Sequence, residues 1–158
     1  MIVNLQRKVK IESKLFVSFA DSLLAMVPNA RDGSFSVAFV SDRRMTELNR
    51  FFRGKDDTTD VLSFPHENDE FVQSEGFSPS ATDAERADAH TPNSNFLGDI
   101  VISVEQAARQ AKENKFTLEN EIKQLILHGL LHLCGYDHET DDGEMNKREL
   151  ELRRKLKI

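Results

Sequence analysis

Residues 117–138 read TLENEIKQLILHGLLHLCGYDH, and the rest of the chain is expected to pack around this stretch. From Ile122 to Cys134 it is apolar on nearly every side, which is typical of a helix buried in the centre of a domain. Thr117 can cap the start of that helix, and Gly135 can end it by adopting a left-handed conformation. We therefore expect a buried central helix on which the other elements pack.

Three of the chain's five histidines lie in this stretch. His128 and His132 are four residues apart, so a helix places them on one face, one turn apart. Such a pair can also consist of ordinary core histidines, but the turn expected at Gly135 brings a third, His138, towards the same point. Three imidazoles leave one coordination position open, as in catalytic zinc sites. The sequence therefore predicts one zinc ion per chain, bound by His128, His132 and His138.

The spacing His-x-x-x-His-x-x-Gly-x-x-His is also that of the ligands in metzincin peptidases. In those enzymes the residue after the first histidine is a glutamate that serves as the general base. Here that residue is Gly129, which has no side chain, so the peptidase base is absent. A phosphodiester substrate instead needs positive charge against its phosphoryl oxygens, which an arginine provides. The spacing with this glycine therefore favours phosphodiester cleavage over peptide cleavage.

The composition is that of one soluble domain, with 158 residues, of which 30% are charged and 39% are hydrophobic. No apolar run reaches the ~18 residues that span a bilayer, and the N-terminus lacks the pattern of a signal peptide. The single cysteine, Cys134, excludes an intramolecular disulfide and fits a reducing compartment. We expect a single metal-hydrolase domain over residues 1–158, located in the cytoplasm and without membrane contact.

The net charge of −6 is concentrated in one segment. Residues 66–95 contain seven acids and one base and are rich in small polar residues and proline, which indicates a flexible acidic insertion or, alternatively, a lid. By contrast, residues 43–55 carry five bases and one acid, a surface that attracts an anionic partner. Its candidate contact residues, besides Arg53, are Arg43, Arg44, Arg50 and Lys55.

Hydrophobic periodicity and turn residues predict four strands and about five helices. The strands are expected over residues 2–11, 34–39, 60–65 and 96–103. The helices are expected over residues 16–27, 42–53, 104–114, 117–134 and 141–157. The residues expected to cap helices are Ser13, Ser41 or Asp42, Ser103 and Thr117. Because strands and helices interleave, the predicted class is α+β (α/β-like), with a small four-stranded mixed sheet packed by about five helices.

Three blocks of the sequence together resemble one known family. They are the histidine block His128–His138, the block LNRFFRGKD at residues 48–56 running into TDVLSFP at residues 59–65, and LGDIVIS at residues 97–103. They resemble the YbeY-type endoribonucleases, the ribosomal-RNA maturation factors of bacteria, over residues 35–65 and 96–155. The resemblance implies a metal-dependent, single-strand-specific endoribonuclease that acts in 16S rRNA 3′-end maturation and ribosome quality control. Its partners would then be single-stranded rRNA and the small ribosomal subunit or its assembly factors.

The resemblance also implies roles for individual residues. Arg53 matches the arginine that the family places beside the metal, and it would stabilise the phosphate as a catalytic residue. The alternative for Arg53 is a cation that favours the C-terminal end of its helix. Asp60 and Asp99 are either cleft acids or caps of backbone turns. Tyr136 and Asp137 are candidates for orienting a ligand imidazole.

The resemblance has departures, and two other functions stay open. Thr58 stands where the family often has a proline, and the acidic segment after Pro65 is longer than usual. Because no general base is visible, the domain could be a ribosome-assembly or RNA-binding factor with a mainly structural zinc. A zinc peptidase is the weaker alternative because of Gly129. The oligomeric state is open from the sequence, with a monomer expected.

Overall fold

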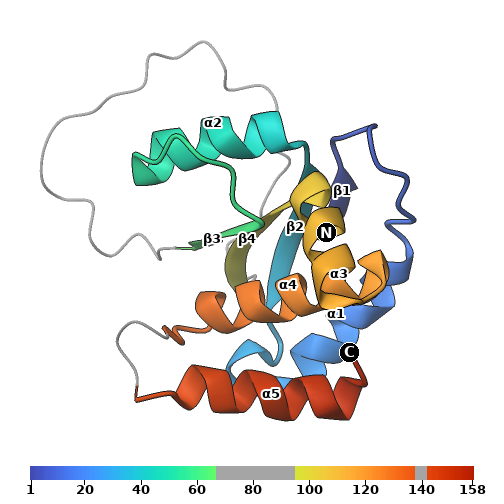
Figure 1. Cartoon of the computed structure of the whole chain (residues 1–158). Coiled ribbons are helices and arrows are strands. Elements are labelled where there is room, and N and C mark those ends of the chain that lie inside the picture. The colour runs from blue at the N-terminus through green and yellow to red at the C-terminus, as the bar shows by residue number, and fades with distance from the viewer. Residues whose placement is uncertain (67–94, 138–141) are drawn as a thin grey trace, which may run out of the picture.

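The computed structural model describes residues 1–66, 95–137 and 142–158, and these form a mixed sheet with helices on both of its faces (Figure 1). The predicted α+β class is confirmed. In chain order the elements are β1 (Ile2–Asn4), α1 (Leu15–Met26), the 3₁₀ turn η1 (Pro28–Ala30), β2 (Ser34–Val40), α2 (Asp42–Arg53), β3 (Val61–Pro65), β4 (Phe96–Ser103), α3 (Val104–Asn114), α4 (Leu118–Leu133) and α5 (Glu144–Leu156).

The sheet has the strand order β1-β2-β4-β3. Strands β1, β2 and β4 are parallel, whereas β3 pairs with β4 in the antiparallel direction and forms the edge. Successive side chains of a strand point to opposite faces. On β4, Ile100 and Ile102 therefore belong to the large core with α1, α3 and α4, whereas Val101 belongs to a smaller cluster with Met45 of α2. Helix α2 thus covers the other face of the sheet.

Helix α4 is the centre of the large core, as its sequence predicts. Ten of its sixteen residues are buried, and they include Gly129. A Cβ atom at Gly129 would lie 2.8 Å from Cγ2 of Ile100 on β4, well inside van der Waals contact. The glycine therefore lets α4 approach the sheet closely. Interiors are packed so densely that a larger residue here would push the helix away from the strand.

The turn after α4 forms as predicted. The N–H of Gly135 donates to the carbonyl of His132 at 3.0 Å, and the N–H of Tyr136 donates to the carbonyl of Leu131 at 3.1 Å. These are the two bonds of a Schellman motif, in which the residue after the helix end adopts a left-handed conformation. Gly135 does so with φ of 86°. The chain is thereby turned back towards the histidine-bearing face of α4.

The structure corrects two expectations near the N-terminus. The strand predicted over residues 2–11 extends only from Ile2 to Asn4, because the side chain of Gln6 bonds both the N–H and the carbonyl of Val9 and holds a turn there. Ser13 does not cap α1, whose N-cap residue is Lys14 without a side-chain bond. The predicted caps Ser41, Ser103 and Thr117 are confirmed at α2, α3 and α4.

Residues 67–94, most of the predicted acidic insertion, lie outside the described residues, so that expectation stays a prediction, as does the single-domain organisation. None of the helices in the described part of the chain has the length and hydrophobicity to cross a membrane.

Candidate active site

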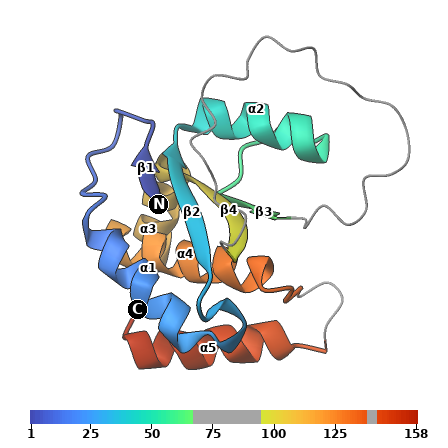
Figure 2. The same ribbon diagram turned by 180° about the vertical axis from the view of Figure 1, so that it is seen from behind.

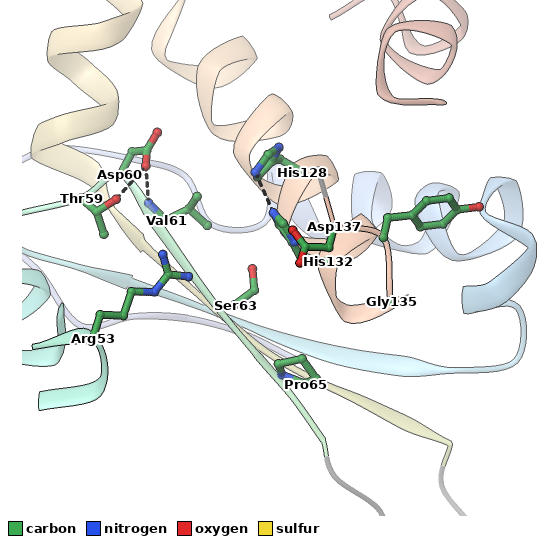
Figure 3. Close-up of a pocket in the computed structure, with 11 residues that line it drawn as sticks. Arg53, Thr59, Asp60, Val61, Ser63, Pro65, His128, His132, Gly135 and Asp137 are labelled. Carbon is green, nitrogen blue, oxygen red and sulfur yellow. Dashed lines mark hydrogen bonds between the residues drawn. The ribbon is translucent and has the colours of Figure 1, made fainter. Parts of the chain in front are cut away.

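A pocket of about 520 Å³ opens between the edge strand β3 and the C-terminal half of α4. Its walls come from the end of α2, from β3 and the residues just before it, from α4 and from the turn that follows α4 (Figure 3). We call it the histidine pocket, and its lining residues are Arg53, Thr59, Asp60, Val61, Ser63, Pro65, His128, His132, Gly135, Tyr136 and Asp137.

The two predicted helical ligands meet in this pocket. Nε2 of His132 lies 3.1 Å from Nε2 of His128, and the ring centroids are 4.7 Å apart. Two nitrogen ligands of one tetrahedral zinc ion lie ~3.3 Å apart, given Zn–N bonds of ~2.05 Å. The arrangement of the two imidazoles therefore fits a zinc ion held between their Nε2 atoms. The third predicted ligand, His138, lies outside the described residues, and no group of three or more potential ligands forms within those described.

A carboxylate from α5 holds the first of these imidazoles. Nδ1 of His128 lies 3.1 Å from Oε2 of Glu149, and only 8% of Glu149 is exposed. Because an ionised carboxylate only accepts hydrogen bonds, Nδ1 of a neutral His128 must carry the hydrogen. Its Nε2 then presents a lone pair to the pocket. Metal-binding histidines commonly have such a carboxylate partner, which fixes the tautomer and the ring orientation.

The electrostatics keep Glu149 ionised. Burial alone would raise the pKa of Glu149, but the hydrogen bond with His128 and the charge of Arg153 outweigh it and lower the pKa below its ordinary value. Arg153 also forms an ion pair with Glu149, one helical turn away. The sequence analysis did not single out Glu149. The available signal was its position in line with Met145 and Leu152 on the inward stripe of α5, where a lone acid needs a partner.

Arg53 reaches the same pocket from the other side. It is the last residue of α2, and its guanidinium lies across the pocket from the two imidazoles, with Ser63 of β3 between them (Figure 3). Tyr136 and Asp137 line the pocket from the turn after α4. The chain thus brings together residues from positions 53 to 137 that are far apart in the sequence.

The two candidate cleft acids differ in their placement. Asp60 lines the histidine pocket, and both of its carboxylate oxygens accept hydrogen bonds. Oδ1 accepts from the N–H of Val61 at 2.8 Å and from the hydroxyl of Thr59 at 3.1 Å. Oδ2 accepts from Nε2 of Gln110 at 3.1 Å. It therefore caps the start of β3 as well as lining the site. Asp99 is exposed on β4 and does not line this pocket.

None of the four predicted basic contacts, Arg43, Arg44, Arg50 and Lys55, lines the pocket. Arg43 and Arg44 form ion pairs with Glu47 on the exposed face of α2, and Arg50 forms one with Asp56. Lys55 is exposed just after α2 ends. Arg50 and Lys55 are near Arg53 at the C-terminal end of α2, whereas Arg43 and Arg44 lie in its first turn. Cys134 does not line the histidine pocket, and burial raises the pKa of its thiol to about 11.

Fold and site together define a class: small α+β proteins whose buried central helix presents a histidine pair to an arginine across an open pocket. The chain belongs to the family described as Endoribonuclease YbeY, whose model matches residues 1–157. A relative of that name from Alkaliphilus metalliredigens is 40% identical over 94% of this chain and 89% of its own length. Another, from Thermodesulfovibrio yellowstonii, is 33% identical over 95% of this chain and 91% of its own.

The fold is shared with a protein of known structure. The solution structure of a Thermotoga maritima protein is similar to this chain with a TM-score of 0.57 and 29% sequence identity. The similarity covers 96% of this chain and 85% of that protein. The predicted family is therefore confirmed.

Proposed function

We propose that this protein is a zinc-dependent endoribonuclease that cuts single-stranded RNA in the cytoplasm. Within that activity we infer a role in 16S rRNA 3′-end maturation and ribosome quality control, with the small ribosomal subunit or its assembly factors as partners. The observation that carries the proposal is the pair of Nε2 atoms 3.1 Å apart in a pocket that Arg53 also lines. The name Endoribonuclease YbeY of the relatives supports the same activity.

The residues present fit a single zinc ion. His128 and His132 would hold it through Nε2, and His138 is the proposed third ligand from sequence spacing. A bound zinc ion supplies a Lewis acid that lowers the pKa of a coordinated water molecule. Glu149 contributes by keeping the ring hydrogen of His128 on Nδ1, so that Nε2 carries no hydrogen and can bind the zinc ion.

Arg53 recognises the scissile phosphate in this proposal. A guanidinium can donate two parallel hydrogen bonds to phosphate oxygens, and its charge opposes the negative charge that develops there. The hydroxyls of Thr59 and Ser63, on the wall formed by β3 and the residue pair before it, can position the ribose or the phosphate. A single strand can turn one phosphate into this concave pocket, whereas an A-form duplex keeps its phosphates on a rigid surface.

The two alternative functions are less well supported. The peptidase alternative needs a base at residue 129, but the Cβ direction of Gly129 leads into Ile100 of the sheet and the residue does not line the histidine pocket. The assembly-factor alternative, with a mainly structural zinc, does not account for the relatives' name Endoribonuclease YbeY. We therefore propose neither.

The test compares cleavage of a labelled single-stranded RNA by the wild type, His132→Ala and Arg53→Ala. We expect His132→Ala to lose zinc binding and cleavage together, and Arg53→Ala to retain zinc while cleaving ~10²–10³-fold more slowly. The matched control is Arg154→Ala, an exposed arginine of α5 that does not line the pocket, which should cleave at the wild-type rate. Full cleavage by zinc-free protein, or equal cleavage of a duplex, would contradict the proposal.

A further inference from the structure

A second cavity lies directly beside the histidine pocket. It has a volume of about 540 Å³, within the range of small-molecule sites, and it shares Asp60, Val61 and His128 with the histidine pocket as lining residues. Its remaining walls come from the end of α3, from Phe116 in the α3–α4 connection, from the first half of α4 and from Arg153 of α5. Nothing in the chemistry proposed above uses these walls.

Three buried polar atoms of this cavity lack hydrogen-bond partners. Among the described residues, three buried side-chain atoms have no hydrogen-bond partner: Oε1 of Gln110, Oε2 of Glu121 and Nε of Arg153. All three residues line this cavity, and Glu121 is only 6% exposed. Most buried polar atoms in proteins are paired, so three unpaired ones around a single cavity indicate a ligand with complementary groups.

The same three side chains are held in place by their other atoms. Nε2 of Gln110 donates to Asp60 at 3.1 Å, Asn114 hydrogen-bonds the side chain of Glu121, and the guanidinium of Arg153 is paired with Glu149. Each of these three side chains is therefore oriented by a neighbouring residue. Such preorganisation lowers the cost of ordering these side chains when a ligand binds.

The charges of the walls restrict the ligand. The acids Asp60, Glu113 and Glu121 line the cavity and disfavour an anion such as a free phosphate. The guanidinium of Arg153 disfavours a bare metal cation. The ligand group should therefore be uncharged, with donors for Gln110 and Glu121 and an acceptor for Arg153.

The three nucleobases with an exocyclic amino group match this pattern. The amino group of adenine, cytosine or guanine has two N–H donors, and a ring nitrogen next to it is an acceptor for the Nε–H of Arg153. Uracil has a single N–H between two carbonyls, so it matches the pattern of two donors and one acceptor poorly. Phe116, 46% exposed, lines the cavity with an apolar ring. Proteins that read unpaired RNA commonly stack a base on such a ring while contacting its edge.

We propose that this cavity, the base pocket (Gln110, Phe116, Glu121 and Arg153), binds an amino-bearing base (adenine, cytosine or guanine) of the nucleotide next to the phosphodiester in the histidine pocket. The shared wall of Asp60, Val61 and His128 makes the two cavities adjacent, as consecutive nucleotides of one strand require. The inference rests on the proposed function in that the RNA strand supplies the base.

The test titrates the full-length protein with adenosine, cytidine or uridine and follows the nitrogen-bound hydrogens by NMR. Adenosine and cytidine should shift the signals of the Arg153 Nε–H and the Gln110 amide, with affinities at least ~tenfold above that of uridine. Glu121→Gln and Phe116→Ala should each weaken adenosine binding ~tenfold. The control Glu119→Gln, on the same helix but outside the cavity, should bind like the wild type.

The variants should remain folded, which makes a loss of binding interpretable. Burial raises the pKa of Glu121 above its ordinary value, with only partial opposition from Asn114 and Arg153, so a neutral amide of the same shape costs little stability. If no nucleoside shifts these signals, or if uridine shifts them equally, the base pocket is overturned even when RNA is cleaved. If the nucleosides bind as expected but no RNA is cleaved, the base pocket stands and the proposed endoribonuclease function fails.

Discussion

Glu149 shows at the scale of one residue how the fold orients His128, a proposed metal ligand. A histidine pair at i and i+4 leaves each ring free to rotate and to carry its hydrogen on either nitrogen. The 3.1 Å contact between Glu149 and His128 removes both freedoms for the first ring. The pair with Arg153 in turn holds the carboxylate. A buried acid that is doubly paired is therefore a positioning residue and not only a stabilising one.

We predict that Glu149→Ala binds zinc ~10–100-fold more weakly than the wild type, because His128 loses the acceptor that orients it. Glu149→Gln, which keeps an acceptor oxygen, should lose less. Competition with a chromophoric chelator measures the affinity without any reference to cleavage. The control is Glu151→Ala, whose half-exposed side chain on α5 pairs only with other surface residues. Equal zinc affinity in Glu149→Ala and the control would remove Glu149 from this role.

At the scale of elements, the first residue of α2, Asp42, links this helix to β4 and α3. The hydroxyl of Ser103 donates to Oδ1 of Asp42 at 2.5 Å, and Arg109 of α3 donates to Oδ2 at 2.6 Å. The hydroxyl of Thr58 adds a longer contact to Oδ1 at 3.4 Å. Burial alone would raise the pKa of Asp42, but Ser103 and Arg109 outweigh it and lower the pKa below 3.8. These bonds position the helix whose last residue is Arg53.

We predict that Asp42→Asn lowers the free energy of unfolding by about 1–3 kcal/mol at pH 7, because ion-assisted hydrogen bonds are lost. Since the folded pKa lies below the unfolded value, Asp42 contributes this stability above the unfolded pKa and loses it as the pH falls through the folded pKa. The difference between variant and wild type should therefore shrink between about pH 5 and pH 2. Denaturant titrations across that range measure it.

The control for this variant is Asp56→Asn. The side chain of Asp56 is 72% exposed and pairs with Arg50 on the surface, where an ion pair contributes little to the free energy of unfolding. Its unfolding free energy should match the wild type across the same pH range. If the free energy of unfolding of Asp42→Asn were lower than that of the wild type by the same amount at every pH, the substitution would act through lost packing and not through the lost charge.

At the scale of the whole molecule, two groups of exposed bases lie at opposite ends. Helix α2, with Arg43, Arg44 and Arg50, lies above the sheet in Figure 1. Helix α5, which ends with Arg154 and Lys155 and is followed by Lys157, lies below the sheet, and the reverse view agrees (Figure 2). The net charge of −6 therefore does not describe the surface around the histidine pocket. An RNA strand that enters this pocket should meet the bases of α2 and not the exposed bases at the end of α5, Arg154, Lys155 and Lys157.

We predict that replacing Arg43, Arg44 and Lys55 together by alanine weakens single-stranded RNA binding and flattens its salt dependence. Each lost phosphate contact reduces the slope of log K against log salt by ~0.7, so the three contribute up to ~2. The matched control replaces Arg154, Lys155 and Lys157 by alanine, which changes the net charge equally at the other end. Fluorescence anisotropy at several salt concentrations compares them. Equal slopes of log K against log salt for the two variants would mean that RNA binding depends on the net charge and not on the position of the basic residues.

The sequence by itself determined the elements that depend on near neighbours. The apolar residues of α4, the cap at Thr117 and the glycine at Gly135 define the central helix and its turn, because periodicity, capping and a positive φ are local properties. The same locality explains why the spacing of His128 and His132 sufficed to predict their meeting. Where a local pattern had no tertiary support, as for the strand over residues 2–11, the prediction was wrong beyond Asn4.

Only the tertiary structure decided which distant side chains meet. Glu149 reaches His128 because α5 packs beside α4, and the unpaired atoms of Gln110, Glu121 and Arg153 surround one cavity because three helices converge there. Gly129 looked like a missing base in the sequence, and the structure shows it as a contact with Ile100. The spacing of residues in the sequence predicts which side chains lie on the same face of one helix or strand. It does not predict which side chains of different elements meet, because those contacts depend on how the buried faces of the elements pack together.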